Sequence, residues 1–422
     1  MEWLGQVPEG WEVKRLKFGV DNINQKCLEE APLTPFVALE HIEPWTGKLM
    51  VDESSQSDGQ PSCYQSDDVL FCKLRPYLAK VHLAKVNGIC TSELLVLRAQ
   101  HGIFPKYLHR FLLSRDTIDC ITASTYGAKM PRANWEFIGN LLLPIPPLPE
   151  QRAIAAFLDQ QCAQIDSLIE KKQRMLDLLD EKRRAVITQA VTRGLDPTVP
   201  MKDSGVEWLG MVPEEWEVNS MQQVCSEFKA GPFGSSLTKE MYSASGYRVY
   251  GQEQVIPNDF SIGDYYIDSE KFSELKQYAV CEGDILISCV GTFGKIAIVP
   301  HGIEQGIINP RLIRIRVAPG VNPKYLAVFL CSPTAYSQFC YFSRGGTMDI
   351  INIGIIKRIQ IPLPPLPEQQ GIADYLDAQC AAMDRQRKNL EKSIELLREY
   401  RASLITHAVT GKIDVRDVAP LQ

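Results

Sequence analysis

Basic and aromatic side chains gather in two polar loops of the first half of the chain. One loop carries Lys73, Arg75, Tyr77 and Lys80, and the other carries Tyr126, Lys129 and Arg132. Lys and Arg bind phosphate oxygens, and polar side chains that reach the edges of bases can read a sequence. The two loops therefore predict a surface that contacts nucleic acid.

The second half offers a comparable set of polar loops. The segment AGPFGSSLT, residues 230–238, could present backbone N–H and hydroxyl groups to a phosphate. A loop at residues 344–347 corresponds in position to residues 126–129 of the first half. Each loop alone could be an ordinary solvated turn, but recurrence at matching places favours binding. The candidate side chains of this half are Phe233, Ser235, Ser236, Arg344 and Thr347.

No pattern in the sequence matches a catalytic or metal site. The segment GTFGK, residues 291–295, is too short for a phosphate-binding loop and lacks the Ser or Thr after its Lys, so it predicts a hairpin turn. An Asn-Pro-Pro-aromatic or Asp-Pro-Pro-aromatic element is absent, which argues against a self-contained adenine methyltransferase. The six histidines show no metal-ligand spacing. We therefore expect no metal and no catalysis in this chain.

Composition is that of a soluble globular protein of 422 residues, with 45% hydrophobic and 23% charged residues. The sequence contains no apolar run long enough to span a bilayer and no secretory signal at its start, so we expect a cytoplasmic protein. Twelve cysteines include no C-x-x-C pair, and Cys72, Cys90 and Cys289 lie in apolar runs that predict buried thiols. The net charge of −6 argues mildly against a simple polyanion binder, although a local basic cleft would suffice.

Two internal repeats divide the chain into halves. PPLPEQRAIAAFLDQQCAQID, residues 146–166, returns as PPLPEQQGIADYLDAQCAAMD, residues 364–384, and WLGQVPEGWEV, residues 3–13, returns as WLGMVPEEWEV, residues 208–218. Such self-similarity marks two copies of one structural unit. Each copy predicts a turn and short strand, a variable α/β region, a Pro-rich turn and one long helix.

The variable regions keep a common pattern of buried positions while their turn residues differ. Residues 66–81 and 282–299 each predict two strands joined by a polar turn. Residues 88–98 correspond in pattern to residues 306–316. Residues 104–114 and 322–332 both predict short amphipathic helices. A binding protein that diversifies its specificity on a fixed core would show this pattern.

Each long helix is bounded by residue types that favour helix ends. Pro149 and Pro367 suit the first helical turn, and Gly194 and Gly411 suit the C-cap. The enclosed spans exceed forty residues, or roughly 65 Å of helix. Because both carry the same apolar seam, we expect them to pack together as an antiparallel coiled coil, although each could instead pack only on its own domain. The expected seam residues are Ile154, Leu158, Ile165, Leu168, Met175, Leu179, Ile372, Leu376, Met383, Leu390, Leu397 and Leu404.

The combination of these motifs makes the chain resemble the specificity subunit of a type I restriction-modification system. The resemblance runs from Trp3 to about Asp414, and the double occurrence of PPLPEQ makes it highly specific. It implies two target recognition domains that each read one half of a split duplex DNA sequence, with the helices as a spacer. It also implies two modification subunits that use S-adenosylmethionine, two restriction subunits that use ATP and magnesium, and no cofactor in this chain.

The expected fold class is α+β, with two α/β target recognition domains joined by two long helices and related by a pseudo-two-fold axis. The expected domains are residues 1–149 and, with a linker, residues 195–367. The central helix occupies residues 150–194, the C-terminal helix residues 368–415 and a tail residues 416–422.

Two other functions remain open at this point. A coiled-coil adaptor whose globular ends bind proteins or small ligands would suit the acidic net charge, and salt-dependent, sequence-selective DNA binding would exclude it. A stand-alone nuclease or methyltransferase is the third possibility, and activity of the purified chain without partners would establish it.

Overall fold

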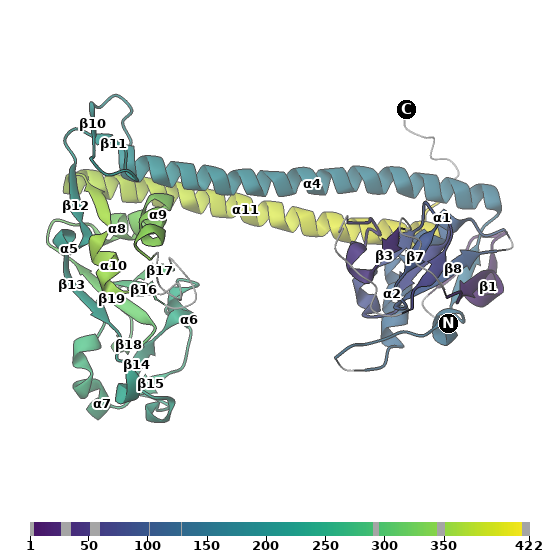
Figure 1. Ribbon diagram of the computed structural model, residues 1–422, viewed down its shortest axis with the longest axis horizontal. Coiled ribbons are helices and arrows are strands. Elements are labelled where there is room, and N and C mark those ends of the chain that lie inside the picture. The colour runs from purple at the N-terminus through teal and green to yellow at the C-terminus, as the bar shows by residue number, and fades with distance from the viewer. Residues whose placement is uncertain are drawn as a thin grey trace. The chain divides into compact units, whose positions relative to one another are not determined.

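The computed structural model describes residues 4–26, 35–50, 60–100, 102–127, 129–289, 295–343 and 351–415. The chain forms two compact units (Figure 1). The first unit contains residues 1–174 and 390–422, and the second contains residues 175–389. Each unit therefore includes one globular region and a part of both long helices.

The two long helices are α4, Leu148–Arg193, and α11, Leu366–Val409. Both begin one residue before the proline that the sequence predicted for the first turn. Both are followed by a glycine in the left-handed region, Gly194 with φ 76° and Gly411 with φ 73°. This conformation is costly for other residues, which is why glycine marks the helix end. The predicted helices and their caps are confirmed.

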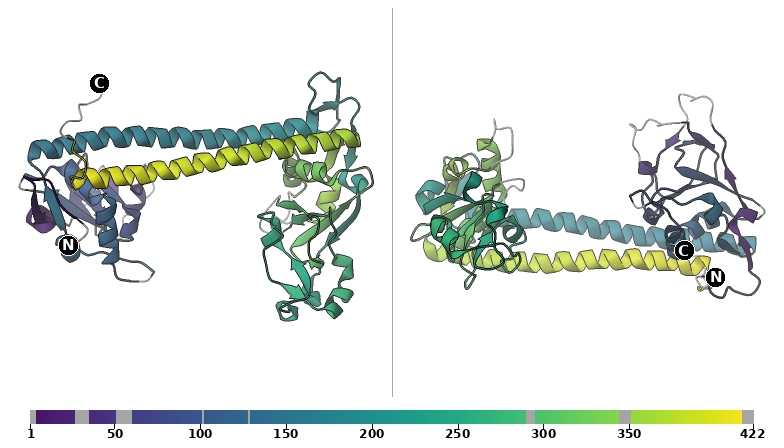
Figure 2. Two further views of the ribbon diagram at one scale, coloured as in Figure 1. Left: turned by 180° about the vertical axis from the view of Figure 1, so that it is seen from behind. Right: turned by 90° about the horizontal axis from the view of Figure 1, so that it is seen from below.

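Ion pairs between α4 and α11 show that the helices pack antiparallel. In the first unit, Arg401 donates from Nε to Asp166 Oδ1 at 2.9 Å. In the second unit, Arg387 binds Asp180, and Arg183 binds Asp384. Each step forward along α4 is matched by an equal step back along α11, so one register accounts for all three pairs. Figure 2 shows the two helices side by side.

Most of the expected seam is buried, but its central part differs from the prediction. Leu168 and Met175 are exposed, at 46% and 53%, while Leu176 and Ile394 are buried instead. A strict seven-residue repeat drifts about 20° per heptad relative to a straight helix. After Leu158, the buried stripe of α4 includes one residue more than the seven-residue repeat predicts. Beyond that point the buried positions fall one residue later, so that Leu176 is buried in place of Met175. The buried predicted residues are Ile154, Leu158, Ile165, Ile372, Leu376, Met383 and Leu404, and Leu179, Leu390 and Leu397 are partly buried.

The first unit contains a four-stranded sheet and a three-stranded sheet. The larger has the order β2-β8-β5-β6, with bounds Val20–Ile23, Leu94–Ala99, Val69–Cys72 and Val81–Leu83. The smaller has the order β3-β7-β4, with bounds Phe36–Val37, Gly88–Cys90 and Ser62–Tyr64. The helices are α1, Pro105–Leu112, α2, Arg115–Ala123, and α3, Trp135–Ile138, with short 3-10 turns η1, Leu16–Phe18, η2, Leu39–His41, and η3, Pro76–Leu78.

The second unit repeats this plan with local changes. Its four-stranded sheet has the order β13-β19-β16-β17, with bounds Cys225–Ala230, Leu312–Val317, Ile285–Ser288 and Ile296–Ile298. Its three-stranded sheet has the order β15-β14-β18, with bounds Tyr266–Ile267, Tyr247–Tyr250 and Gly306–Ile308. The helices are α5, Met221–Val224, α6, Gln252–Val255, α7, Ser269–Glu274, α8, Pro323–Leu330, α9, Pro333–Phe342, and α10, Ile353–Arg358. The 3-10 turns are η4, Gly234–Ser236, η5, Lys239–Met241, and η6, Lys276–Tyr278, and strands β10, Met201–Asp203, and β11, Met211–Pro213, form a hairpin after α4.

The repeated opening and closing motifs of each half pair with each other. Strand β1, Glu12–Arg15, is antiparallel to β9, Leu142–Ile145, and strand β12, Glu217–Ser220, is antiparallel to β20, Gln360–Leu363. The W-E-V segment therefore lies beside the strand that leads into the Pro-Leu-Pro-Glu-Gln turn.

In each unit, a buried tyrosine links the globular region to the end of one long helix and to the strand that leads into the other. Tyr107 on α1 donates its hydroxyl to Pro144 O at 2.7 Å and to Val409 O at 3.0 Å. Tyr325 on α8 does the same with Pro362 O at 2.6 Å and Val191 O at 3.4 Å. Burial raises the pKa of both tyrosines well above the usual value, which keeps the donating proton in place. The two halves therefore have equivalent tyrosine hydrogen bonds at this position.

The glutamine of each PLPEQ turn forms a second set of equivalent hydrogen bonds beside the tyrosine. Gln151 accepts from Phe104 N at 2.8 Å and donates to Gly102 O at 3.1 Å. Gln369 accepts from Asn322 N at 2.8 Å and donates to Gly320 O at 3.3 Å. The amide thus holds the start of each long helix against the start of α1 or α8.

The cysteines mostly follow the prediction. Cys72, Cys90 and Cys289 are buried free thiols, whereas Cys63 is part of a disulfide that the sequence did not indicate. None of the helices in the described ranges is long and apolar enough to span a membrane.

Candidate nucleic-acid interface

Backbone hydrogen bonds bring the predicted loops of the first unit together. Arg75 N donates to Pro131 O at 2.8 Å, and Ala133 N donates to Lys73 O at 2.9 Å, so the turn after β5 lies against the loop at residues 126–132. Lys73 N also donates to Glu93 O at 3.1 Å, which adds the β7–β8 connection. Three loops that are distant in sequence thus form one loop cluster at the end of the four-stranded sheet.

Several predicted side chains of this cluster are exposed. Tyr77 is 44% exposed and Tyr126 is 62% exposed, and Arg75 and Lys129 are also exposed. Arg75 adopts φ 49°, in the left-handed region, which costs free energy for any residue but glycine. The exposed side chains of Arg75 and Lys129 leave positive charge at the surface of this cluster.

The other three predicted side chains of the first unit are less available, and two of them have partners within the protein. Lys80 donates from Nζ to Leu39 O at 2.7 Å. Arg132, although exposed, pairs with Glu93 at 2.8 Å. Lys73 is only partly exposed. The positive charge available to a phosphate is therefore smaller than the sequence indicates.

The loop after β13 provides the predicted surface of the second unit. Gly231 N donates to Leu312 O at 2.9 Å, and a Cβ at Gly231 would lie only 1.9 Å from Asn309 O. Only glycine permits this approach, which brings the loop against the β18–β19 connection. Phe233 is 68% exposed, and Ser235 and Ser236 lie in η4, where the Ser236 side chain is exposed. Arg344 and Thr347 lie outside the described residues, as do residues 291–294 of the predicted hairpin turn.

Sequence reasoning missed three polar residues beside this loop. Asn309 accepts from Arg311 N at 2.9 Å through its side chain. Gln252 Oε1 lies 3.5 Å from Arg311 Nη1, and Gln252 Nε2 donates to Ser288 Oγ at 2.6 Å. The available signal was the segment IINPR, residues 307–311, in which Asn309 and Arg311 follow a short apolar run.

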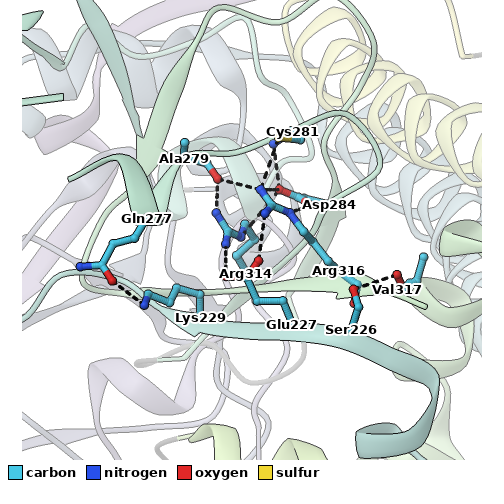
Figure 3. A network of polar contacts seen from close by, with 10 residues as sticks. All are labelled: Ser226, Glu227, Lys229, Gln277, Ala279, Cys281, Asp284, Arg314, Arg316 and Val317. Atoms are coloured by element: carbon cyan, nitrogen blue, oxygen red, sulfur yellow. Dashed lines mark hydrogen bonds and ion pairs between the residues drawn. The ribbon is translucent and has the colours of Figure 1, made fainter. Parts of the chain in front are cut away.

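At the opposite end of each four-stranded sheet from these loops, a buried carboxylate is paired with arginine. Asp68 binds Arg98 through two hydrogen bonds of 2.7 Å, and the bonds to Asp68 raise the pKa of Arg98. In the second unit, Asp284 binds Arg316 at 2.9 Å, and Glu227 binds both Arg316 and Arg314 (Figure 3). These arginines are occupied within the fold, so they stabilise the sheets and are not candidates for DNA contact.

Within the described ranges, no group of three His, Cys, Asp or Glu residues lies close enough to hold a metal ion. The exposed groups are instead arginines, lysines, aromatic rings, hydroxyls and amides in loops. Such groups can bind phosphate and the edges of bases without breaking bonds.

Comparison with known proteins agrees with this arrangement. The family model of the type I restriction modification DNA specificity domain matches residues 44–176 and 213–396. The chain is 22% identical to the type I restriction enzyme MjaVIII specificity subunit of Methanocaldococcus jannaschii, over 98% of this chain and 95% of that protein. It is 26% identical to the type I restriction enzyme EcoKI specificity subunit of Escherichia coli K12, over 75% of this chain and 68% of that protein.

Solved structures show the same fold. A chain from a study of assembly and conformational transition of the type I restriction-modification system aligns with a TM-score of 0.77 at 19% identity, over 97% of this chain and all of that one. The HsdS subunit of Thermoanaerobacter tengcongensis aligns with a TM-score of 0.55 at 18% identity, over 97% and 98% of the two chains.

The family match covers most of the chain, and the repeated loop clusters are of a kind that can select a sequence. In this family the S-adenosylmethionine and ATP sites belong to partner subunits. The chain therefore belongs to the type I restriction-modification DNA specificity domain family, as the non-catalytic subunit that determines DNA recognition.

Proposed function

We propose that residues 1–149 and 195–367 act as two target recognition domains that read the two halves of an asymmetric bipartite site in duplex DNA. The helices at residues 150–194 and 368–415 would fix the length of the unread spacer. The observation that carries this proposal is the pair of loop clusters at equivalent ends of the two four-stranded sheets, with different side chains in each.

The proposed DNA contacts are the polar and aromatic residues that the sequence predicts in these loops. Arg75, Tyr77, Tyr126 and Lys129 would approach the first half-site. Lys73, which is partly exposed, would also contribute, as would Lys80 and Arg132 once their bonds to Leu39 and Glu93 break. Phe233, Ser235 and Ser236 would approach the second half-site, together with Arg344 and Thr347. Phosphate contacts would set the register, and base contacts would set the sequence.

We propose that the chain assembles with two modification subunits and two restriction subunits. S-adenosylmethionine would be used by the former, and ATP with magnesium by the latter. Charged side chains on the outer helix faces, including Lys171, Arg174, Arg385 and Lys388, are exposed and available for docking the modification subunits. Since cellular DNA is the substrate, we expect the complex to work in the cytoplasm.

A matched change in both helices tests the spacer role. Seven residues inserted after Gln173 lie between Asp166 and Asp180, and seven inserted after Ile394 lie between Arg387 and Arg401. The register on either side is thereby retained. The added helix is roughly 10 Å at 1.5 Å per residue, or about three base pairs at 3.4 Å each. Mapping methylated adenines in cells carrying the complete system should show a spacer about three base pairs longer and unchanged half-sites.

An insertion in α4 alone is the matched control. It breaks the register on one side and should reduce methylation without producing a defined new spacer. Altered half-sites with a constant spacer would contradict the proposal.

A further inference from the structure

We infer that Arg311 is a specificity-determining residue of the second unit and reads a guanine in its half-site, with Gln252 as its positioning residue. This inference rests on the proposed function. Arg311 was not among the side chains that the sequence singled out, and only the folded arrangement of four segments brings it forward.

The backbone of Arg311 is held at both of its polar groups. Its N–H donates to Asn309 Oδ1 at 2.9 Å, and its carbonyl accepts from Cys289 N at 3.0 Å. The first bond fixes the β18–β19 turn, and the second joins that turn to the end of β16. A side chain on such a support starts from a defined position, which reduces the entropy lost on binding.

The guanidinium of Arg311 is exposed, and its contact within the described ranges is to a neutral amide. Gln252 is itself oriented by the bond from Nε2 to the buried hydroxyl of Ser288. A neutral partner orients the arginine without cancelling its charge. This contrasts with Arg132 of the first unit, whose charge is compensated by Glu93.

The equivalent place in the first unit holds the opposite charge. Lys73 N donates to Glu93 O in the same way that Cys289 N donates to Arg311 O. The backbone is therefore the same, while the side chain is an acid in one unit and a base in the other. A position that keeps its backbone bond but reverses its charge is suited to distinguishing two half-sites.

The loop after β13 lies beside this position. Gly231 packs against Asn309 and leads into Phe233 and the hydroxyls of η4, the proposed phosphate contacts. Arg311 therefore lies next to groups that would hold the backbone of the duplex. An arginine in the major groove can donate two hydrogen bonds to O6 and N7 of guanine, a pattern that no other base pair presents.

The test uses the full chain assembled with its modification subunits. Affinity is measured for duplexes that carry the recognition site, with each base pair of both half-sites substituted in turn. Arg311→Ala should lower discrimination by about 10- to 100-fold at one guanine of the second half-site and leave the first half-site unchanged. Arg311→Lys should lose much of the same discrimination because an ammonium lacks the planar fork that matches O6 and N7, yet retain the salt dependence of binding. Gln252→Ala should weaken discrimination at the same guanine by a smaller factor.

Arg193→Ala is the matched control, because Arg193 is an exposed arginine at the end of α4 that lies outside the loop cluster. It should leave discrimination unchanged. Uniform weakening on all duplexes with Arg311→Ala, with the salt slope reduced by about one, would identify a phosphate contact and overturn the inference. Full discrimination with Arg311→Ala would overturn it as well. A wild-type complex that reads no bipartite sequence would instead overturn the proposed function.

Discussion

In the first unit the buried carboxylate of Asp68 meets one arginine, whereas in the second unit Asp284 lies among two arginines and shares them with Glu227. Arg314 occupies the strand position that Val96 occupies in the first unit, since Arg314 pairs with the second residue of β16 and Val96 pairs with the second residue of β5. Both sheets therefore contain one buried Asp–Arg pair, and the sheet of the second unit also buries the additional charge of Arg314.

Buried histidines distinguish the first unit from the second. His109 on α1 is buried and donates from Nε2 to Val81 O at 3.0 Å, and His82 donates from Nδ1 to Gly47 O at 2.8 Å. The equivalent helix α8 has Ala327 where α1 has His109. Burial lowers the pKa of His109 to about 3 and also lowers that of His82. Protonation is therefore unfavourable inside the first unit only.

The helix ion pairs differ in exposure. Arg401 and Asp166 are 8% and 17% exposed, and Arg401 also donates to Trp45 O at 2.8 Å. Arg183 and Asp384, the equivalent pair, are 36% and 56% exposed. The segment around Trp45 covers the first pair. The same Arg–Asp pair therefore contributes differently to the free energy of unfolding in the two units.

The largest expected effect separates the two buried carboxylates. Asp284→Asn should lower the free energy of unfolding of the second unit by about 3–5 kcal/mol, because Arg314, which is 1% exposed, and Arg316 are then left with the single carboxylate of Glu227 between them. Asp68→Asn should cost about 1–3 kcal/mol, because Arg98 is 29% exposed and can be solvated. Urea titration with hydrogen exchange of β16 and β5 peptides resolves the two units. An equal or larger loss for Asp68→Asn would break the comparison.

Acidification should act selectively on the first unit. Because the folded pKa of His109 is about 3 and its ordinary value is 6.5, the unfolded chain binds the proton first. The stability contribution of neutral His109 is complete above pH 6.5 and is lost progressively between 6.5 and 3, by about 1.4 kcal/mol per pH unit.

Unfolding at pH 7 and pH 5, followed by exchange of α1 and α8 peptides, measures this effect. His109→Ala imitates the second unit and should flatten the pH dependence of the α1 peptides, even if it is less stable at pH 7. Equal pH dependence of α1 and α8 in the wild type would show that the histidines do not govern acid stability.

The smallest expected effect concerns the helix pairs. Arg401→Ala should cost about 1–3 kcal/mol, since it removes a buried hydrogen-bonded charge. Arg183→Ala should cost about 0–1 kcal/mol, as for other exposed pairs. Thermal unfolding of both variants at low and high salt checks this, and only the Arg183 difference should shrink with salt. Similar losses for the two variants would mean that the cover around Trp45 contributes little.

The elements that the sequence predicts well are those with local signals. The helices, their glycine caps and the paired strands of residues 66–81 and 282–299 follow from residue types a few positions apart. The exposure of Leu168 and Met175 could not be predicted in this way, because it depends on a helix register that drifts over many turns. The partners of Lys80 and Arg132 could not be predicted from local sequence either, since Leu39 and Glu93 lie in other segments of the chain.

By itself, the sequence determined that the chain is a duplicated unit, where each long helix begins and ends, and which loops carry basic and aromatic groups. These properties depend on neighbouring residues and on the repeat. The tertiary structure alone decided which charges remain available, because neutralisation requires a partner from another segment. It separated Arg314, Arg316 and Arg401, which are engaged within the fold, from Arg75 and Arg311, whose guanidinium groups are exposed at the ends of the sheets.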